Sequence, residues 1–321
     1  MIKVGIVGAT GLVGQTIVKV LKEENLLSVI DLTLFASDKN YGKIISYYGK
    51  EFRLINLSEK IKQQKFDVVF FSAGDEISRQ WVHVFEENGA YVIDNTNAFR
   101  KEELVPLIVP EINAEKITKN SKIIANPNCS TIQLAVVLDR LLKVSAISNI
   151  VVSTYQSVSG AGSKAVSDLK NKTNKVISAG IYDNVIAQIG SFDKCGFSTE
   201  ENKIMFETNK ILDADISVVA TAVRVPVSFC HTESVYVKFK NKIEMSKIQN
   251  TLKQEHIVFD ENRVFVPTDV VGSNKTFVFR LRQISETEIV FVIIADNLRR
   301  GSAFNAVQIF KHLLNEKFIK Y

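Results

Sequence analysis

The chain has few cysteines, prolines and glycines: its 321 residues include 3 Cys, 5 Pro and 15 Gly. Three cysteines that lie far apart do not make a disulfide framework, which excludes a disulfide-held scaffold and fits a reducing compartment. Scarce Gly and Pro, together with 46% hydrophobic residues, indicate a globular protein of roughly two domains. We therefore expect a cytoplasmic protein.

Long hydrophobic runs are also missing. The longest apolar run near the end, residues 289–295, is far too short to span a bilayer. The start of the chain runs directly into an apolar strand pattern and lacks the layout of a signal peptide. These observations predict a soluble protein without a membrane partner.

The chain lacks a strong charge of one sign. Its net charge is +5 and its pI is near 8.9, with the basic residues spread along the chain. A nucleic-acid partner would need a clustered basic patch with aromatic residues, and the sequence shows none. An anionic small-molecule substrate is compatible with this balance. The sequence also has no cluster of metal ligands at the usual spacing, so no metal is expected.

The most informative stretch is residues 122–131, KIIANPNCST. It opens as an apolar strand, breaks at Pro127 and leads into a helix pattern over residues 132–143, for which Ser130 or Thr131 can be the N-cap. A helix N-terminus favours an anion, so the thiol of Cys129 is expected to ionise near neutral pH. A lone cysteine that merely packs is the alternative. The strand, the proline break and the helix start favour a nucleophile.

A glycine-rich turn follows the first strand. Residues 2–7 have a buried-strand pattern, residues 8–14 read GATGLVG, and an amphipathic helix is expected from Gln15 to about Glu24. Strand, glycine turn and helix together predict a dinucleotide-binding unit, in which a pyrophosphate rests on the helix N-terminus. Glycines needed only for tight packing are the alternative.

The end of the second strand, residues 31–37, bears on the choice of nicotinamide cofactor. A protein that is specific for NAD has an acidic residue there, which binds the ribose hydroxyls. Here Ser37 and Lys39 can hold a 2′-phosphate, and Asp38 would oppose it if it pointed inward. We favour NADP.

Alternating strand and helix patterns across residues 1–126 predict a Rossmann-like, doubly wound parallel sheet. From residue 128 the pattern changes to strands at 149–156, 216–226, 228–239, 256–266 and 276–294, with helices at 163–177 and behind the capping box at Ser198. We expect an NADP-binding domain over 1–127, joined by a C-terminal helix within 298–321. Residues 128–297 should form an α+β catalytic and dimerisation domain with a mostly antiparallel sheet.

Several polar residues stand out in these patterns. Arg224 is embedded in an apolar strand, which invites a carboxylate partner. His231, near a strand start, is the best acid/base candidate of the 4 histidines. Gln156 either caps a backbone group or hydrogen-bonds a substrate. Arg100 is either a surface arginine or an anion ligand.

The remaining cysteines are expected to be inert or exposed. Cys230 adjoins His231, but neighbouring strand residues face opposite sides, so we expect it to pack. Cys195, between Lys194 and Gly196, is expected to be an exposed loop thiol.

Over its full length the chain resembles the aspartate-β-semialdehyde dehydrogenase family. The motifs that carry the resemblance follow in the family's order: 8–14 (GATGLVG), 97–100 (NAFR), 109–113 (VPEIN), 126–131 (NPNCST), 156–162 (QSVSGAG), 207–210 (ETNK), 224–234 (RVPVSFCHTES) and 296–301 (DNLRRG). The resemblance implies NADPH-dependent reductive dephosphorylation of β-aspartyl phosphate to aspartate β-semialdehyde. This reaction serves lysine, threonine, methionine and diaminopimelate biosynthesis. It also implies a homodimer or homotetramer built through the second domain's sheet.

The resemblance assigns roles to single residues. Cys129 would carry the acyl thioester, Gln156 would orient the substrate and His231 would be the acid/base group. Arg224 would hold the substrate α-carboxylate and Glu207 its amino group, although Glu207 and Lys210 can also form a surface ion pair. Arg100 and Lys210 would hold phosphate. The NADP site would be lined by Gly8, Thr10, Gly11, Leu12, Val13, Ser37, Lys39, Ser159, Gly160 and Asn297.

Two departures from the family pattern are visible. Lys39-Asn40 stands where the family usually has an arginine and a serine, and lysine lacks the fork geometry of arginine. Cys230 stands where glycine is frequent. Two other functions remain open: a related phospho-acyl reductase such as N-acetyl-glutamyl-phosphate reductase, and a nucleotide-binding paralogue that has lost catalysis.

Overall fold

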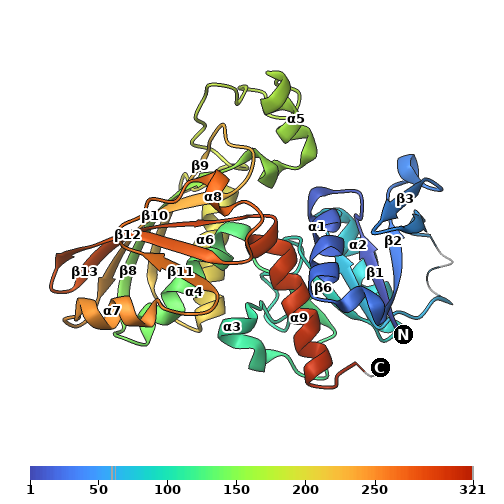
Figure 1. Cartoon of the computed structure of the whole chain (residues 1–321), viewed down its shortest axis with the longest axis horizontal. Coiled ribbons are helices and arrows are strands. Elements are labelled where there is room, and N and C mark those ends of the chain that lie inside the picture. Colours follow the sequence, from blue (N-terminus) through green and yellow to red (C-terminus); the bar gives the residue numbers. More distant parts are fainter. Residues whose placement is uncertain (59–60, 62, 320–321) are drawn as a thin grey trace. The chain divides into compact units, whose positions relative to one another are not determined.

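The computed structural model of the chain describes residues 1–58, 61 and 63–319. The chain divides into two compact units (Figure 1): unit 1 contains residues 1–127 and 302 onward, and unit 2 contains residues 128–301. The return to unit 1 was expected at residue 298. It falls four residues later, because the DNLRRG turn belongs to unit 2.

Unit 1 is built on a five-stranded parallel sheet. Its strands are β1 (Ile2–Val7), β2 (Ile30–Phe35), β5 (Val68–Phe71), β6 (Tyr91–Asp94) and β7 (Ile123–Ala125), in the order β2-β1-β5-β6-β7. Every residue of β5 and β6 is buried, as expected of strands covered on both faces. The predicted Rossmann-like sheet is confirmed.

Helices cover both faces of this sheet (Figure 1). Helices α1 (Leu12–Glu23) and α9 (Phe304–Asn315) share one core with alternate residues of β1. On the other face, Phe85 of α2 (Asp75–Glu87) packs edge-on against Phe35 and Phe71. The unit also contains α3 (Pro110–Asn113), the hairpin β3 (Ile44–Tyr47) and β4 (Lys50–Arg53), and the short 3₁₀ turns η1 (Leu26–Ser28), η2 (Asp38–Asn40) and η4 (Ala114–Lys116).

Unit 2 is built on a mixed six-stranded sheet. Its strands are β8 (Ile147–Gln156), β9 (Ser217–Arg224), β10 (His231–Phe239), β11 (Ile257–Asp260), β12 (Thr276–Ser285) and β13 (Glu288–Ala295). They lie in the order β11-β12-β13-β10-β8-β9, in which the two outer pairs are parallel and the inner pairs antiparallel. Burial alternates along β8, β9 and β10, so one face of the sheet carries the core and the other does not.

The covered face of this sheet holds α4 (Cys129–Leu142), which contacts β8, β13 and α6 (Thr199–Leu212). Helix α4 is buried along nearly its whole length, as its apolar sequence predicted. The unit also contains α5 (Ser163–Asn171), α7 (Met245–Thr251), α8 (Pro267–Val270), the 3₁₀ turn η5 (Val158–Ala161) and the π-helical turn η6 (Arg299–Ala303), which leads into α9.

Several predicted boundaries were wrong for local reasons. Helix α1 begins at Leu12, not at Gln15, because Gly11 already serves as its N-cap. Helix α5 ends at Asn171, because Lys172 adopts a left-handed conformation with φ 56°. The strand predicted over 276–294 is a hairpin that turns between β12 and β13. The strand predicted over 256–266 ends at Asp260. Within the described residues, no helix is long and apolar enough to cross a membrane.

Candidate active site

The candidate nucleophile Cys129 is the first residue of α4, and Asn128 caps this helix. The backbone N–H groups of Ser130 and Thr131 donate to Asn128 Oδ1 over 2.9 and 3.3 Å. The N-cap is therefore Asn128 and not Ser130 or Thr131 as predicted, because an amide oxygen one residue before Cys129 reaches both N–H groups. The predicted position of Cys129 at the helix N-terminus, where a negative charge is favoured, is confirmed.

Gly301 lies directly against Cys129. A Cβ atom placed on Gly301 would lie 2.9 Å from Cys129 Cβ and 3.0 Å from the Cys129 carbonyl oxygen. Gly301 N–H donates to the carbonyl of Asp296 over 3.0 Å, which closes the turn after β13. The turn therefore passes the nucleophile at a distance that only glycine permits.

His231 is fully buried at the start of β10. The backbone N–H of Ser157 donates to His231 Nδ1 over 3.1 Å. A ring nitrogen that accepts a hydrogen bond carries no proton, so the neutral ring has its proton on Nε2. Nε2 is buried without a hydrogen-bond partner among the described residues. Burial, followed by the positive charge of Arg224, lowers the pKa of His231 to about 3, so the imidazole is neutral at physiological pH.

Arg224 ends β9 with its side chain buried, and its Nη1 donates to the carbonyl of Ser157 over 2.7 Å. Burial lowers the pKa of the Arg224 guanidinium, and attraction to Glu200 and Cys129 opposes this effect. A Cβ atom placed on Gly160 would lie 3.1 Å from Arg224 Nη1 and 3.5 Å from His231 Nε2. Arg224, His231 and the Gly160 backbone therefore share one small region next to the thiol.

A cavity of about 400 Å³ lies beside Arg224. The segment between α5 and α6 forms much of its wall, and Ile186 pairs with Arg224 through two backbone hydrogen bonds of 2.8 and 3.0 Å. This cavity has the size of a small-molecule site. It is lined by Ala161, Val176, Ile177, Ser178, Ala179, Ile186, Gln188, Ile189, Gly190 and Arg224.

Glu207 contacts the N-cap of α4 directly, and Gln156 is linked to the same cap through Glu200. Gln156, the last residue of β8, is buried and donates to Glu200 Oε1 over 3.2 Å. Glu207 of α6 is buried and accepts the backbone N–H of Asn128 over 2.6 Å. Glu207 is therefore not a surface residue, which removes the surface ion-pair interpretation for it. Lys210, one turn later on α6, is partly exposed.

Ser159 and Asn297 belong to a buried polar cluster around the His231 loop. Asn297 Oδ1 accepts from Ser157 Oγ at 3.1 Å, Ser159 Oγ at 3.1 Å and Cys230 N–H at 3.0 Å. Cys230 has φ 72°, a backbone conformation that favours glycine. Burial raises the pKa of the Cys230 thiol to about 12, so it packs as predicted. Cys195 is exposed, also as predicted.

In unit 1 the glycine turn has the form that a dinucleotide needs. Gly8 has φ 86°, and a Cβ atom there would lie 2.8 Å from the carbonyl oxygen of Ser72. A Cβ atom on Gly14 would collide with the backbone of Gly8. Gly11 caps α1, and Thr10, Leu12 and Val13 surround this helix start. The backbone is therefore open at the N-terminus of α1, where a pyrophosphate binds.

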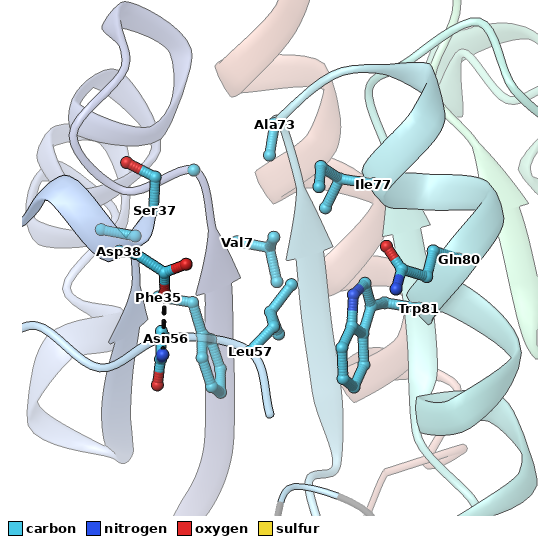
Figure 2. A pocket seen from close by; sticks show the side chains of 12 residues that line it. Val7, Phe35, Ser37, Asp38, Asn56, Leu57, Ala73, Ile77, Gln80 and Trp81 are labelled. Atoms are coloured by element: carbon cyan, nitrogen blue, oxygen red, sulfur yellow. Dashed lines mark hydrogen bonds between the residues drawn. The ribbon is translucent and has the colours of Figure 1, made fainter. Parts of the chain in front are cut away.

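Next to this turn, a cavity of about 360 Å³ opens at the carboxyl ends of β1, β2 and β5 (Figure 2). Phe35, Leu57 and Trp81 give it apolar walls, and Asn56 donates to Asp38 over 2.8 Å. Its full lining is Val7, Gly8, Phe35, Ala36, Ser37, Asp38, Asn56, Leu57, Ala73, Ile77, Gln80 and Trp81. The position and shape fit the adenosine part of a dinucleotide.

Ser37 lines this cavity and precedes the turn η2, and Lys39 lies within that turn. Both are exposed, and Lys43 Nζ donates to Asn40 Oδ1 over 2.8 Å, which brings a second ammonium to the same turn. Elsewhere in unit 1, Arg100 is buried and donates to the carbonyl of Asn95 over 2.8 Å. The guanidinium of Arg100 is thus fixed in place by burial and by this hydrogen bond, so Arg100 is not an ordinary surface arginine.

Three supporting residues were missed at the sequence level: Asn128, Ser157 and Glu200. Each carries a common polar side chain, and each acts through a partner far away in the sequence. The NPNCST motif contained Asn128, and its place before Cys129 was the available signal. Among the described residues, no group of three His, Cys, Asp or Glu side chains is placed to hold a metal ion.

Comparison with known proteins agrees with this geometry. The semialdehyde dehydrogenase NAD-binding domain matches residues 3–120, and the semialdehyde dehydrogenase dimerisation domain matches residues 138–300. The aspartate-semialdehyde dehydrogenase of Aquifex aeolicus is 40% identical over 99% of both chains. The crystal structure of aspartate semialdehyde dehydrogenase II from Vibrio cholerae superposes with a TM-score of 0.93 at 38% identity, covering 98% of this chain and 99% of that one. The same Vibrio enzyme complexed with ASA gives 0.92 at 38% identity, covering 99% of each chain.

Proposed function

This chain belongs to the aspartate-semialdehyde dehydrogenase family, and on that basis we propose that it reduces β-aspartyl phosphate to aspartate β-semialdehyde with NADPH. The observation that carries the proposal is Cys129 at the start of α4, with Arg224 close enough to interact with it electrostatically. The reaction is a step toward lysine, diaminopimelate, threonine and methionine.

The first chemical step is acyl transfer to Cys129. The thiolate sulfur attacks the acyl carbon, the bond from that carbon to the phosphate oxygen breaks, and a thioester forms as phosphate leaves. The N-terminus of α4 supports the negative charge on sulfur before attack. Arg100 and Lys210 are the cations we assign to the phosphate.

His231 acts in the second step as a hydrogen-bond donor. When bound, NADPH supplies the hydride that reduces the thioester carbon. Negative charge then develops on the former carbonyl oxygen, and the Nε2–H of neutral His231 is the donor available to it. When the carbon–sulfur bond breaks, its electron pair returns to Cys129 and the aldehyde is released.

Three residues of unit 2 are assigned to the substrate. Arg224 is a buried guanidinium beside a cavity, which suits bidentate binding of the α-carboxylate. Glu207 is assigned to the amino group, and Gln156 orients the substrate. The family membership and the burial of all three side chains support these roles.

NADP is the cofactor we propose, and the residues of unit 1 fit a dinucleotide. The open backbone at Gly8, Gly11 and Gly14 suits the pyrophosphate, and the cavity in Figure 2 suits adenosine. Ser37 and Lys39 are assigned to the 2′-phosphate, and Thr10, Leu12 and Val13 to the same ligand. Ser159, Gly160 and Asn297 of unit 2 are assigned to the cofactor as well, with Asn297 acting by holding Ser159.

The deciding experiment is NADP⁺ reduction by the purified enzyme with aspartate semialdehyde, with and without inorganic phosphate. We expect strictly phosphate-dependent turnover, with NADP⁺ preferred over NAD⁺ by about tenfold or more. A preference for NAD⁺ would contradict the cofactor assignment and would indicate that Asp38 binds the ribose hydroxyls. Turnover only with N-acetylglutamate semialdehyde would replace the proposed substrate by that of the related reductase. Absence of turnover with either would indicate a catalytically silent paralogue.

Replacement of the nucleophile gives the matching prediction. Cys129→Ser should abolish turnover, because a serine hydroxyl at this position stays protonated and cannot form the thioester. The variant should keep the far-UV circular dichroism spectrum and the Tm of the parent enzyme. Substantial residual turnover in a folded Cys129→Ser enzyme would remove Cys129 from the mechanism.

We also propose a homodimer that forms through the outer face of the six-stranded sheet. On this face Val151, Tyr155 and Val219 are 46%, 43% and 44% exposed, and Val151 and Val219 are register neighbours on β8 and β9. Exposed apolar side chains grouped on one sheet face are typical of a protein interface. The match to a dimerisation domain supports the same assignment. A reducing compartment, the cytoplasm, suits an enzyme with a catalytic thiol.

A further inference from the structure

Glu200, the second residue of α6, has a buried carboxylate that joins two parts of the site. Its Oε1 accepts hydrogen bonds from Asn128 Nδ2 over 2.8 Å and from Gln156 Nε2 over 3.2 Å. Its Oε2 accepts from Lys203 Nζ over 3.2 Å. None of the roles assigned above involves Glu200.

The charge on this carboxylate fixes the orientation of the Asn128 amide. An ionised carboxylate can only accept hydrogen bonds, so the NH₂ group of Asn128 must face it. The amide oxygen of Asn128 is thereby turned toward the N–H groups of Ser130 and Thr131, which it caps. If the amide turned over, the cap would be lost and two N–H groups at the start of α4 would lose their partner.

The same carboxylate fixes Gln156. One Gln156 N–H donates to Glu200 and the other to Thr154 Oγ1 over 3.3 Å. Neither N–H is left for a ligand, so the amide oxygen is the group that Gln156 can offer. Gln156 is therefore set up to accept a hydrogen bond and not to donate one to a substrate carbonyl.

Glu200 remains ionised although it is buried. Burial would raise the pKa of the Glu200 carboxyl, but the charge of Lys203 and the hydrogen bonds from Asn128, Gln156 and Lys203 outweigh it, and the pKa lies below its usual value. The carboxylate therefore stays an acceptor over the working pH range.

We propose that Glu200 is a positioning residue that orients the Asn128 cap of the nucleophile helix and the amide of Gln156 together. This role rests on the proposed function for its kinetic consequences, but its structural consequences do not require turnover. It predicts that catalysis depends on a residue that contacts neither substrate nor sulfur.

Glu200→Gln is the first test, and Glu201→Gln is its matched control. A glutamine at position 200 can donate as well as accept hydrogen bonds, so it no longer fixes the orientation of the Asn128 and Gln156 amides. Glu201 is the neighbouring residue, equally buried, but among the described residues its carboxylate accepts hydrogen bonds from backbone N–H groups alone, those of Ser198 and Ala222. We expect kcat/KM to fall about 100-fold in Glu200→Gln, since small displacements at a reacting centre have effects of this size. Glu201→Gln should lose stability and keep its turnover per folded molecule.

Amide hydrogen exchange tests the cap without reference to activity. In Glu200→Gln, exchange of the peptide containing Ser130 and Thr131 should accelerate about tenfold. Glu201→Gln should accelerate exchange in α6 and β9 instead. Equal acceleration at the start of α4 in both variants, or in neither, would overturn the proposal. If the parent enzyme fails to turn over aspartate semialdehyde, the proposed function fails, and this comparison still decides the role of Glu200.

A double-mutant cycle tests the link to Gln156. If Glu200 acts partly through Gln156, Glu200→Gln should cost much less in a Gln156→Ala background than in the parent, about tenfold or less. The same cost in both backgrounds would overturn this part of the proposal. Should Glu200→Gln fail to fold, Glu200→Asp keeps the charge but withdraws the carboxylate by one methylene. It should show the same faster exchange at Ser130 and Thr131, and unchanged exchange would count against the proposal.

Discussion

His231 shows how the environment of one residue selects its chemistry. Because the Ser157 N–H occupies Nδ1 and burial lowers the pKa to about 3, the ring should stay neutral from pH 5 to 8. The folded pKa lies below the usual 6.5, so this group stabilises the fold above pH 6.5 and the contribution is lost as the pH falls toward the folded pKa. NMR titration of the ring protons, assigned by their loss in His231→Gln, measures this directly. A midpoint near 6.5 would contradict it.

Glu233 provides the opposite case two residues along β10. It is fully buried, and burial raises the pKa of its carboxyl well above the usual value, opposed only partly by Gln133. The contribution of Glu233 to the stability of the fold is greatest below the unfolded pKa of 4.5 and is lost as the pH rises through the folded pKa. Over that range the free energy of unfolding falls by at most about 1.4 kcal/mol per pH unit. Glu233→Gln should remove this loss. Urea unfolding of both proteins at pH 5 and pH 8 measures it, and parallel pH dependence would contradict it.

At the residue scale, the sequence identified groups whose chemistry is rare and missed groups whose chemistry is common. Cys129, Arg224 and His231 stood out because a thiol at a helix start, a guanidinium in an apolar strand and a scarce histidine are each unusual. Asn128 and Glu200 did not, because amides and carboxylates have many ordinary uses. Their meaning depends on a contact across 72 positions of the chain, which no local pattern reveals.

At the scale of elements, the turn of residues 296–301, which follows β13 and runs into η6, forms a boundary of the site. Gly301→Ala should push the turn away from Cys129, because the added Cβ would lie 2.9 Å from Cys129 Cβ. We expect a loss of about 10- to 100-fold in kcat/KM, as for other small displacements of a nucleophile. Initial rates with aspartate semialdehyde and phosphate measure this. Rates equal to those of the parent in a folded variant would show that the turn accommodates the added methyl group without displacing the thiol.

Periodicity predicted the elements better than their ends. Strand β1 was predicted with its observed bounds, because it is a short apolar run that ends next to Gly8. The hairpin of β12 and β13 was predicted as one strand, because its turn at Glu286 and Thr287 lacks glycine, proline and asparagine. The left-handed Lys172 that ends α5 gave no signal for the same reason.

At the scale of the whole molecule, the exposed face of the six-stranded sheet sets the expected assembly. Val219→Lys places a charge within the proposed interface and should convert dimers to monomers, because an unpaired charge is costly to bury. Val271→Lys is the control, since Val271 is similarly exposed (49%) but lies outside the strands of the sheet. Sedimentation velocity distinguishes the species. A monomeric parent, or an intact Val219→Lys dimer, would contradict the proposed interface.

The surroundings of Cys129 also set an order of events during synthesis. Glu200, Arg224, His231 and Gly301 all follow Cys129 in the chain, and the first of them comes about seventy positions later. A ribosome therefore makes Cys129 well before it makes the charged residues around the thiol and the turn that encloses it. The nascent chain carries an ordinary cysteine, and the reactive one comes into being only when the last strand of unit 2 and its closing turn have been added. The Cys129 thiol therefore becomes reactive only when folding of unit 2 is complete.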